Sequence, residues 1–297
     1  MTIRRALVIA NPASRRGSRA LPRALRTFAE HDVTVDAVLT ERPGHASTIT
    51  RELAPLYDAV FSLGGDGTAM EVLEAAGRHG RPVGILPGGT GNLVARALGT
   101  PLRIERAVHA LLLGHERRID LGELEDGRTF AFAAGVGIDA TMLERASPRF
   151  KRYAGVLAYV MAATYATVQL KRFELRATVD GVEHTFHAAE AMVLNFGTVL
   201  GGMLELAPKV DPSDGWLDLC VYDPRTLGDA LGIGWRIWRH RLTGHAHMHF
   251  LRGKIIRLET VPIRAAQADG ELLGTTPITC VVRPGAARVL TSAAGLA

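Results

Sequence analysis

The sequence predicts an α/β domain followed by an all-β domain, and two observations support this fold class. Up to about residue 117, short apolar runs alternate with segments of helical periodicity, a pattern typical of βαβ units around a parallel sheet. Beyond that point strand-like runs follow one another across tight turns. With 297 residues, 47% of them hydrophobic, the chain can fill two cores. We therefore expect a three-layer α/β/α domain and a β-sandwich domain that flank a cleft.

The first domain is expected to span residues 1–117, and a tail at about 287–297 is expected to return to it. Four apolar runs predict its strands: Ala6–Ala10, Val33–Leu39, Ala59–Leu63 and Val83–Leu86. The periodicity between and after them predicts helices over Ser18–His31, Gly44–Leu53, Thr68–His79, Asn92–Leu98 and Ile104–Leu113. In parallel sheets ligands bind beyond the carboxyl ends of the strands, which is where the chain carries its glycine-rich turns.

The second domain, residues 118–286, is predicted to be a sandwich joined by turns such as Asp180-Gly181 and Pro284-Gly285. Two helices interrupt it, one at Tyr153–Leu170 and one at about Leu227–Arg241. The first holds 18 residues without a charge, close to the lower limit for a membrane span, but its Thr, Gln and Tyr content favours a buried helix. The strands are expected at Arg118–Leu121, Thr129–Ala134, Phe173–Val179, Val182–Ala189, Ala191–Asn195, Leu217–Tyr222, Lys254–Thr260, Ile263–Ala268 and Ile278–Arg283.

Two glycine-rich turns, at residues 64–68 (Gly-Gly-Asp-Gly-Thr) and 87–92 (Pro-Gly-Gly-Thr-Gly-Asn), each follow an apolar strand. Glycine leaves backbone N–H groups bare and lets the main chain approach an anion, so such turns can cradle phosphates. We expect Thr68 and Thr90 to cap the helices that follow. Neither turn has the spacing of a dinucleotide fingerprint or a P-loop, which disfavours a dehydrogenase or a P-loop ATPase.

The ordered motifs resemble the diacylglycerol-kinase-type catalytic domain in its bacterial soluble lipid-kinase form. Gly-Gly-Asp-Gly-Thr alone would be shared with NAD kinases, but the full set covers essentially the whole chain. The segments that carry the resemblance are Asn11-Pro12, residues 64–68, residues 87–92, Gly135-Val136-Gly137-Ile138-Asp139, Ala207-Pro208, residues 211–218 and Asp269-Gly270-Glu271. Relatives often carry Ser-Gly-Lys where this chain has Ser14 to Gly17, and Arg can take the place of that Lys as a phosphate partner.

The resemblance implies an ATP site in the first domain. Asp66 would hold Mg²⁺ against the phosphates, as a hard oxygen ligand should, and Thr40 would lie near the adenosine. The implied nucleotide-binding residues are Asn11, Pro12, Ser14, Arg15, Arg16, Thr40, Gly64, Gly65, Asp66, Gly67, Thr68, Glu71, Gly89, Thr90 and Asn92.

The resemblance also implies a catalytic pair. Asp269 would accept the proton of the lipid hydroxyl as it attacks the γ-phosphoryl group, with Glu271 in support. The alternative for Asp269 is an ordinary Asp-Gly hairpin turn. A structural Mg²⁺ site would use Asp214 with backbone carbonyls of Asp211 and Trp216, and Asp120 would be linked to it through water. Its alternative is an Asx-rich surface turn.

The sequence therefore predicts an ATP- and Mg²⁺-dependent kinase with a diacylglycerol-like acceptor that is met at a membrane surface. Alternatives are an NAD kinase-like enzyme, a sphingosine- or ceramide-type kinase, and a nucleotide- or lipid-binding regulator without turnover. Buried thiols at Cys220 and Cys280 favour a cytoplasmic protein, peripheral at the inner face of the membrane. The net charge of +5 is mild for this length, so no nucleic-acid partner is expected, and a homodimer stays open.

Two further patterns have competing interpretations. His245, His247 and His249 alternate, which predicts three imidazoles on one strand face; a solvated face is favoured over a metal site. The helix at Leu227–Arg241 carries aromatic and basic side chains that either rest on a membrane or pack against the sandwich: Trp235, Arg236, Trp238, Arg239 and Arg241.

Overall fold

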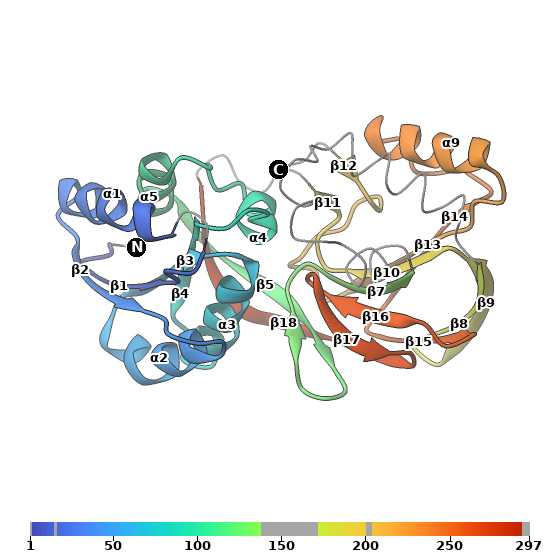
Figure 1. Ribbon diagram of the computed structural model, residues 1–297, viewed down its shortest axis with the longest axis horizontal. Coiled ribbons are helices and arrows are strands. Elements are labelled where there is room, and N and C mark those ends of the chain that lie inside the picture. Colours follow the sequence, from blue (N-terminus) through green and yellow to red (C-terminus); the bar gives the residue numbers. More distant parts are fainter. Residues whose placement is uncertain (1, 15–16, 138–171, 200–203, 293–297) are drawn as a thin grey trace. The chain divides into compact units, whose positions relative to one another are not determined.

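A computed structural model describes residues 2–14, 17–137, 172–199 and 204–292 of the chain. These residues form two compact units (Figure 1). Of the described residues, the first unit comprises 2–14, 17–121, 199 and 284–292, and the second comprises 122–137, 172–198 and 204–283. The first is α/β with a parallel sheet and the second is an antiparallel sandwich, so the predicted fold class is confirmed. The helix predicted at Tyr153–Leu170 lies outside the described residues.

A parallel sheet covered by helices on both faces forms the first unit (Figure 1). Its strand order is β2 (Thr34–Leu39), β1 (Arg5–Ala10), β3 (Ala59–Gly64) and β4 (Pro82–Pro87). One face carries α1 (Gly17–Glu30) and α5 (Ile104–Leu112). The other face carries α2 (His45–Leu53) and α3 (Asp66–Gly77), and short helices lie at Ala54–Leu56 and at α4 (Leu93–Ala97).

Burial within this sheet explains why its sequence reads as continuous apolar runs. Every residue of β3 and β4 is buried, as expected for central strands of a sheet with both faces covered. Phe28 of α1 meets Phe61 of β3 edge-to-face, with ring centroids 4.8 Å apart. Strands β1, β3 and β4 pair in parallel register, so their carboxyl ends, and the loops that follow them, lie at one edge.

Two antiparallel sheets form the second unit (Figure 1). One contains residues 278–283 of β18 (Ile278–Thr291), then β15 (Ile255–Val261), β8 (Phe173–Val179) and β9 (Val182–Ala188). The other runs β14 (Met248–Gly253), β13 (Leu217–Tyr222), β10 (Glu190–Leu194), β7 (Ala133–Gly137), β16 (Ala265–Ala268) and β17 (Glu271–Thr275). The remaining elements of the described chain are β5 (His115–Leu124), which lies mostly in the first unit, β6 (Thr129–Phe130), β11 (Thr198–Val199), β12 (Leu204–Glu205) and α9 (Leu227–Trp238).

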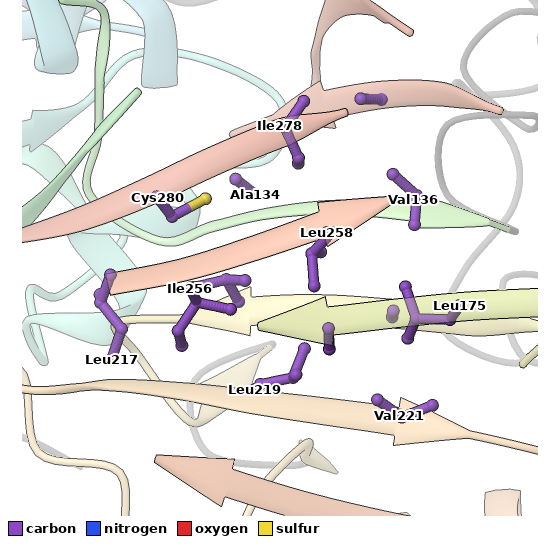
Figure 2. Packing of buried hydrophobic residues seen from close by; sticks show 14 of the residues in the cluster. Ala134, Val136, Leu175, Leu217, Leu219, Val221, Ile256, Leu258, Ile278 and Cys280 are labelled. Atoms are coloured by element: carbon purple, nitrogen blue, oxygen red, sulfur yellow. The ribbon is translucent and has the colours of Figure 1, made fainter. Parts of the chain in front are cut away.

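Side chains from both sheets interdigitate to make the core of this unit. Figure 2 shows Leu219 and Val221 of β13, Ile256 and Leu258 of β15, and Cys280 of β18, all fully buried. Their alternation along each strand matches the period of two that predicted the strands. The hydrophobic contact between the two sheets holds this unit together.

Local predictions were wrong at several points of the chain. The turn expected at Pro284-Gly285 is absent, because β18 runs on to Thr291 and its residues Arg288 and Val289 pair in parallel with β4. Strand β17 went unrecognised because its five residues are mostly exposed and show no alternation. Helix α9 ends at Trp238, three residues earlier than predicted, where His240 takes a positive φ of 52°.

Core burial predicts that both thiols are chemically silent in the folded chain. Cys220 and Cys280 are fully buried, and burial raises the pKa of Cys280 to about 12. We expect Ellman's reagent to modify neither residue in native buffer at pH 8, and both residues in guanidinium. Labelling of the native chain faster than its unfolding rate would contradict this packing.

Candidate active site

The loop after β1 is tied to β3 and α3 by Asn11. Its backbone N–H donates to the carbonyl of Leu63 at 3.0 Å, and its Nδ2 donates to Oγ1 of Thr68 at 3.1 Å. Its Oδ1 accepts from the N–H of Ala13 at 2.9 Å, which closes an Asx turn. Asn11 thus joins the ends of two neighbouring parallel strands at the edge where ligands bind in such sheets.

The turn itself is closed by Ser14. Its hydroxyl donates to the carbonyl of Asn11 at 2.7 Å and accepts from the N–H of Gly17 at 3.1 Å, at the start of α1. Pro12 is exposed at the tip. Arg15 and Arg16, the predicted phosphate partners, lie outside the described residues.

The two glycine-rich turns pack directly against each other. The N–H of Gly88 donates to the carbonyl of Gly64 at 2.9 Å. A Cβ built on Gly89 would come within 2.6 Å of the Cα of Gly65, and one on Gly88 within 2.9 Å of the N of Gly64. No side chain fits at these distances, so glycine is required here by contact between the turns, because neither Gly88 nor Gly89 has a positive φ.

Gly65 differs from its neighbours because the space beside it is open. Among the described residues, a Cβ on Gly65 would meet only the Cα of Gly89, at 3.9 Å, which is ordinary van der Waals contact. Its φ of −88° and ψ of −175° are accessible to any residue. Gly65 precedes α3, whose first N–H groups have no side-chain cap. The fold therefore leaves an accessible helix N-terminus beside a position without a side chain, which suits a phosphate.

Helix capping differs from the prediction. Thr68 lies inside α3 and bonds Asn11, and exposed Thr90 precedes the N-cap of α4, so neither threonine caps its helix. The N-cap of α4 is Asn92, with a φ of 50°. Its side chain turns back instead: Oδ1 accepts from the N–H of Gly89 at 2.9 Å and Nδ2 donates to the carbonyl of Gly89 at 3.0 Å. Asn92 therefore fixes the second glycine turn.

Asp66 supplies the missing cap of α4. Its Oδ1 accepts from the N–H of Val94 at 3.1 Å. Burial raises the pKa of Asp66, partly offset by backbone N–H donors at the start of α4, and within the described residues no ion pair involves this carboxylate. A half-buried carboxylate without a cationic partner suits a divalent metal, because the metal charge would favour the ionised form. Asp66 thus fits the predicted Mg²⁺ contact.

Glu71 and Thr40 have structural partners in the first unit. The carboxylate of Glu71 accepts from the N–H groups of Gly44, at 2.9 Å, and Ser47, at 3.2 Å, at the start of α2. Thr40 is buried after β2, and its N–H donates to the carbonyl of Ala10 at 2.9 Å. Gly67 is exposed in the first turn of α3.

In the second unit, Asp269 is held by three backbone donors. Its Oδ2 accepts from the N–H of Ala131 at 2.7 Å, and its Oδ1 accepts from those of Phe132 and Ala133, both at 2.9 Å. Asp269 and Gly270 form the two-residue turn between β16 and β17, with φ values of 48° and 87°. The hairpin interpretation is therefore correct for the backbone, while the side chain folds inward and is half buried.

A second Asp-Gly turn shows how much of this arrangement is structural. Asp180 and Gly181 join β8 to β9 with φ values of 48° and 86°. The carboxylate of Asp180 accepts from the N–H groups of Lys254, at 2.9 Å, and Ile255, at 2.8 Å. The same device thus occurs twice, and geometry alone does not distinguish Asp269 as a catalytic group.

Glu271 lies two residues after Asp269 at the start of β17 and is exposed. The pKa of Arg128 is raised first by its hydrogen bond with Asp126 and also by the charge of Glu271, which places Glu271 near that guanidinium. The N–H of Gly270 donates to Oε1 of buried Gln267 at 2.9 Å. Within the described residues, no backbone N–H donates to the carboxylate of Glu271, in contrast to that of Asp269.

Asx turns shape the segment of the predicted structural metal site. Oδ1 of Asp211 accepts from the N–H of Ser213 at 3.0 Å, and Oδ1 of Asp214 accepts from that of Trp216 at 3.1 Å. The other oxygen of Asp214 pairs with Arg252. Within the described residues no group of three or more His, Cys, Asp or Glu side chains is arranged to hold a metal ion.

Asp218, at the end of this segment, is a half-buried carboxyl group with an arginine nearby. Burial raises its pKa to about 6, and the Nε of Arg252 lies 3.8 Å from its Oδ1. Arg252 and Lys254 both lie over the ring of Trp216, at 5.7 and 5.0 Å from its centroid. Arg252 was not predicted from the sequence, because no motif there indicates which arginine pairs with Asp214.

Asp120 and the three alternating histidines each have contacts within their own unit. Asp120, in the first unit, is buried and accepts from the N–H of Gly285 at 2.7 Å. The expected histidine strand face is wrong: only His249 lies in β14, where its ring faces Phe186 at 5.1 Å, while His245 and His247 belong to the preceding turn.

Two family models match most of the chain. Residues 5–124 match the family model "diacylglycerol kinase catalytic domain", and residues 133–291 match the "YegS C-terminal NAD kinase beta sandwich-like domain". A diacylglycerol kinase of Staphylococcus saprophyticus is 30% identical over 281 residues, which cover 92% of this chain and 91% of that protein. This chain belongs to the diacylglycerol kinase family. It is a kinase in class, a phosphotransferase of a lipid-kinase family.

Other proteins are also similar to this chain. A diacylglycerol kinase of Staphylococcus aureus is 28% identical over 92% of this chain and 88% of its own length. An uncharacterized protein of Synechocystis is 30% identical over 74% of this chain, which spans 51% of that protein. The crystal structure of a diacylglycerol kinase from Bacillus anthracis has the same fold, with a TM-score of 0.77 at 22% identity and full coverage of both chains.

None of the helices in the described part of this kinase is long and apolar enough to cross a bilayer.

The contact between the glycine turns predicts a contrast between two alanine substitutions. Gly89→Ala would place its Cβ against the backbone of Gly65, so we expect a loss of about 1–3 kcal/mol in the free energy of unfolding. Gly65→Ala enters open space and should cost less than about 1 kcal/mol. Urea unfolding of both variants measures the difference, and equal losses would contradict the contact described here.

Proposed function

We propose that this kinase transfers the γ-phosphoryl group of ATP to a hydroxyl of a diacylglycerol-like lipid, with Mg²⁺ as its metal. The observation that carries the proposal is the pair of glycine turns. They leave the N-terminus of α3 open beside Gly65, at the carboxyl edge of a parallel sheet. The names of the Staphylococcus relatives support diacylglycerol as the acceptor.

In the first unit, the N–H groups at the start of α3 would bind the phosphates. Asn11 and Asn92 hold the loops on either side, so this surface needs little rearrangement when the nucleotide arrives. Mg²⁺ held against the phosphates by Asp66 would neutralise charge that develops during transfer. The contact between Asp66 and α4 keeps that carboxylate in place.

Asp269, in the second unit, would accept the proton. The lipid hydroxyl oxygen forms a bond to the γ-phosphorus as the bond from that phosphorus to the β–γ bridging oxygen breaks, and the hydroxyl proton passes to Asp269. The products are ADP and a phosphate monoester. The three backbone donors fix the orientation of the Asp269 carboxylate, so the proposed base is oriented before the lipid arrives. Exposed Glu271 would support the incoming hydroxyl.

The decisive experiment is a transfer assay with γ-labelled ATP and the purified kinase. Diacylglycerol, a sphingoid base, ceramide, phosphatidylglycerol and NAD are offered in parallel, each with Mg²⁺ and with excess EDTA. We expect label in phosphatidic acid from diacylglycerol, and only with Mg²⁺. Label in the phosphorylated NAD or sphingoid product instead would replace the proposed acceptor. ATP binding without any labelled product would indicate a regulator.

Gly65→Ala tests the phosphate site without disturbing the fold. A methyl group beside the N-terminus of α3 would occupy the space that the phosphates need, so ATP affinity should fall by about 10-fold or more, the equivalent of about 1.4 kcal/mol. Calorimetric titration of wild type and variant measures the change. Gly232→Ala in α9, where a Cβ meets no described residue within 4 Å, is the matched control and should bind ATP as wild type does. An unchanged affinity for Gly65→Ala would place the nucleotide elsewhere.

Asp269→Asn and Asp180→Asn form a matched pair because the two side chains occupy the same kind of turn. Each change replaces one accepting oxygen by an NH₂ group, so both should cost about 1–3 kcal/mol of unfolding free energy. Only Asp269→Asn removes the proposed base, and it should lower kcat by about 10²–10⁴-fold. Activity and urea unfolding are measured side by side. An equal loss of kcat in both variants would show that Asp269 acts only on structure.

A further inference from the structure

The outward face of α9 combines large apolar side chains with positive charge. Leu231, Trp235 and Trp238 are 56%, 59% and 50% exposed, and they recur at the i, i+4 and i+7 positions of one helix face. The opposite face is the one that packs, since Ile233 is 6% exposed. The fold therefore has an inward contact for α9 and leaves the two tryptophans to solvent (orange helix in Figure 1).

The charged side chains of α9 are also unevenly distributed, with the acidic one turned away from the outward face. Asp229 is the only acidic residue of α9, whose residues the structure describes throughout. It is turned away from the outward face, because its carboxylate accepts from the N–H of Thr226 at 2.9 Å and lies 3.8 Å from His247. At the other end the guanidinium of Arg239 lies over the ring of Trp235, 5.6 Å from its centroid.

The end of α9 opens into a basic hollow of about 490 Å³, lined by Trp238, Arg239, His240 and Arg241. His240 lies 3.5 Å from a carboxylate oxygen of Glu205, so the two arginines carry the positive charge that faces outward. Arg239 and Arg241 are exposed. The two tryptophan rings approach each other at 5.0 Å between centroids and form one aromatic surface beside this hollow.

We propose that the outward face of α9, with Leu231, Trp235, Trp238, Arg239 and Arg241, docks this kinase on the surface of an anionic phospholipid bilayer. Tryptophan is the side chain that prefers the level of lipid head groups, and exposed arginines are attracted to anionic ones. The face carries cations and no outward acid, so charge complementarity favours an anionic lipid surface over a second copy of a chain whose net charge is +5. The site goes beyond the proposed function because docking needs no phosphoryl transfer.

Vesicle binding without nucleotide tests the docking face alone. Vesicles of phosphatidylcholine with about one-third phosphatidylglycerol are compared with pure phosphatidylcholine, and raised salt should release the protein. Arg239→Gln with Arg241→Gln should weaken binding by about 25-fold, from about 1 kcal/mol for each cation near the surface. Trp235→Gln with Trp238→Gln should weaken it by about 10-fold or more. Because these side chains are exposed, the variants should unfold at the same urea concentration as wild type.

Matched controls lie on other elements. Arg26→Gln with Arg106→Gln changes the net charge equally, and Leu113→Gln with Ile263→Gln removes apolar side chains of 60% and 68% exposure. Both control pairs should bind as wild type does. Failure of wild type to bind anionic vesicles, or equal losses in the controls, would overturn the proposal. So would a dimer in sedimentation that the tryptophan changes dissociate, because a second copy would then cover the face.

A separate readout keeps this proposal apart from the proposed function. Phosphoryl transfer is measured on a short-chain diacylglycerol dispersed without vesicles, where the docking variants should turn over as wild type does. If vesicles bind and no lipid is phosphorylated, the docking face stands and the function fails. If transfer proceeds and vesicles do not bind, the docking face fails and the function stands.

Discussion

The contact between the two glycine turns is the constraint on which the rest of the first unit's site depends. Gly88 and Gly89 approach Gly64 and Gly65 so closely that no Cβ fits between them. This approach sets where β3 and β4 end relative to each other, and Asn92 locks the second turn in that position. Gly65 takes part in this contact through its backbone, yet a Cβ on Gly65 would meet, among the described residues, only the Cα of Gly89 at 3.9 Å, so space remains beside it.

Five acidic side chains of this chain are partners of backbone N–H groups. Asp66 caps α4, Glu71 caps α2, Asp120 holds Gly285, and Asp180 and Asp269 hold adjacent strands. A carboxylate fixed in this way is already oriented before a substrate arrives, and orientation is a large part of what a catalytic group contributes. Structural and chemical roles therefore coexist in the same residue, and a loss of activity is informative only beside a measured stability.

Strand and helix periodicity was enough to predict the fold class and most elements, because burial on one or both faces leaves a direct pattern in the sequence. Contacts between distant segments left no such pattern. The sequence predicts that Thr68 caps α3, but its hydroxyl oxygen accepts a hydrogen bond from the side chain of Asn11 instead. It marks Pro284-Gly285 as a turn, but pairing with β4 carries the strand through. The donors that hold Asp269 are backbone N–H groups of residues 131–133, and the types of those side chains give no indication of these hydrogen bonds.

Strand β18 has a consequence for how the chain folds during synthesis. Its residues 284–291 complete the sheet of the first unit beside β4, yet the ribosome makes them long after β4 itself. Until then β4 has an unpaired edge, which is a site for mispairing with other strands. The N-terminal unit therefore cannot finish folding first, as domains commonly do, and a nascent chain arrested before residue 284 should recruit chaperones that the finished kinase does not need.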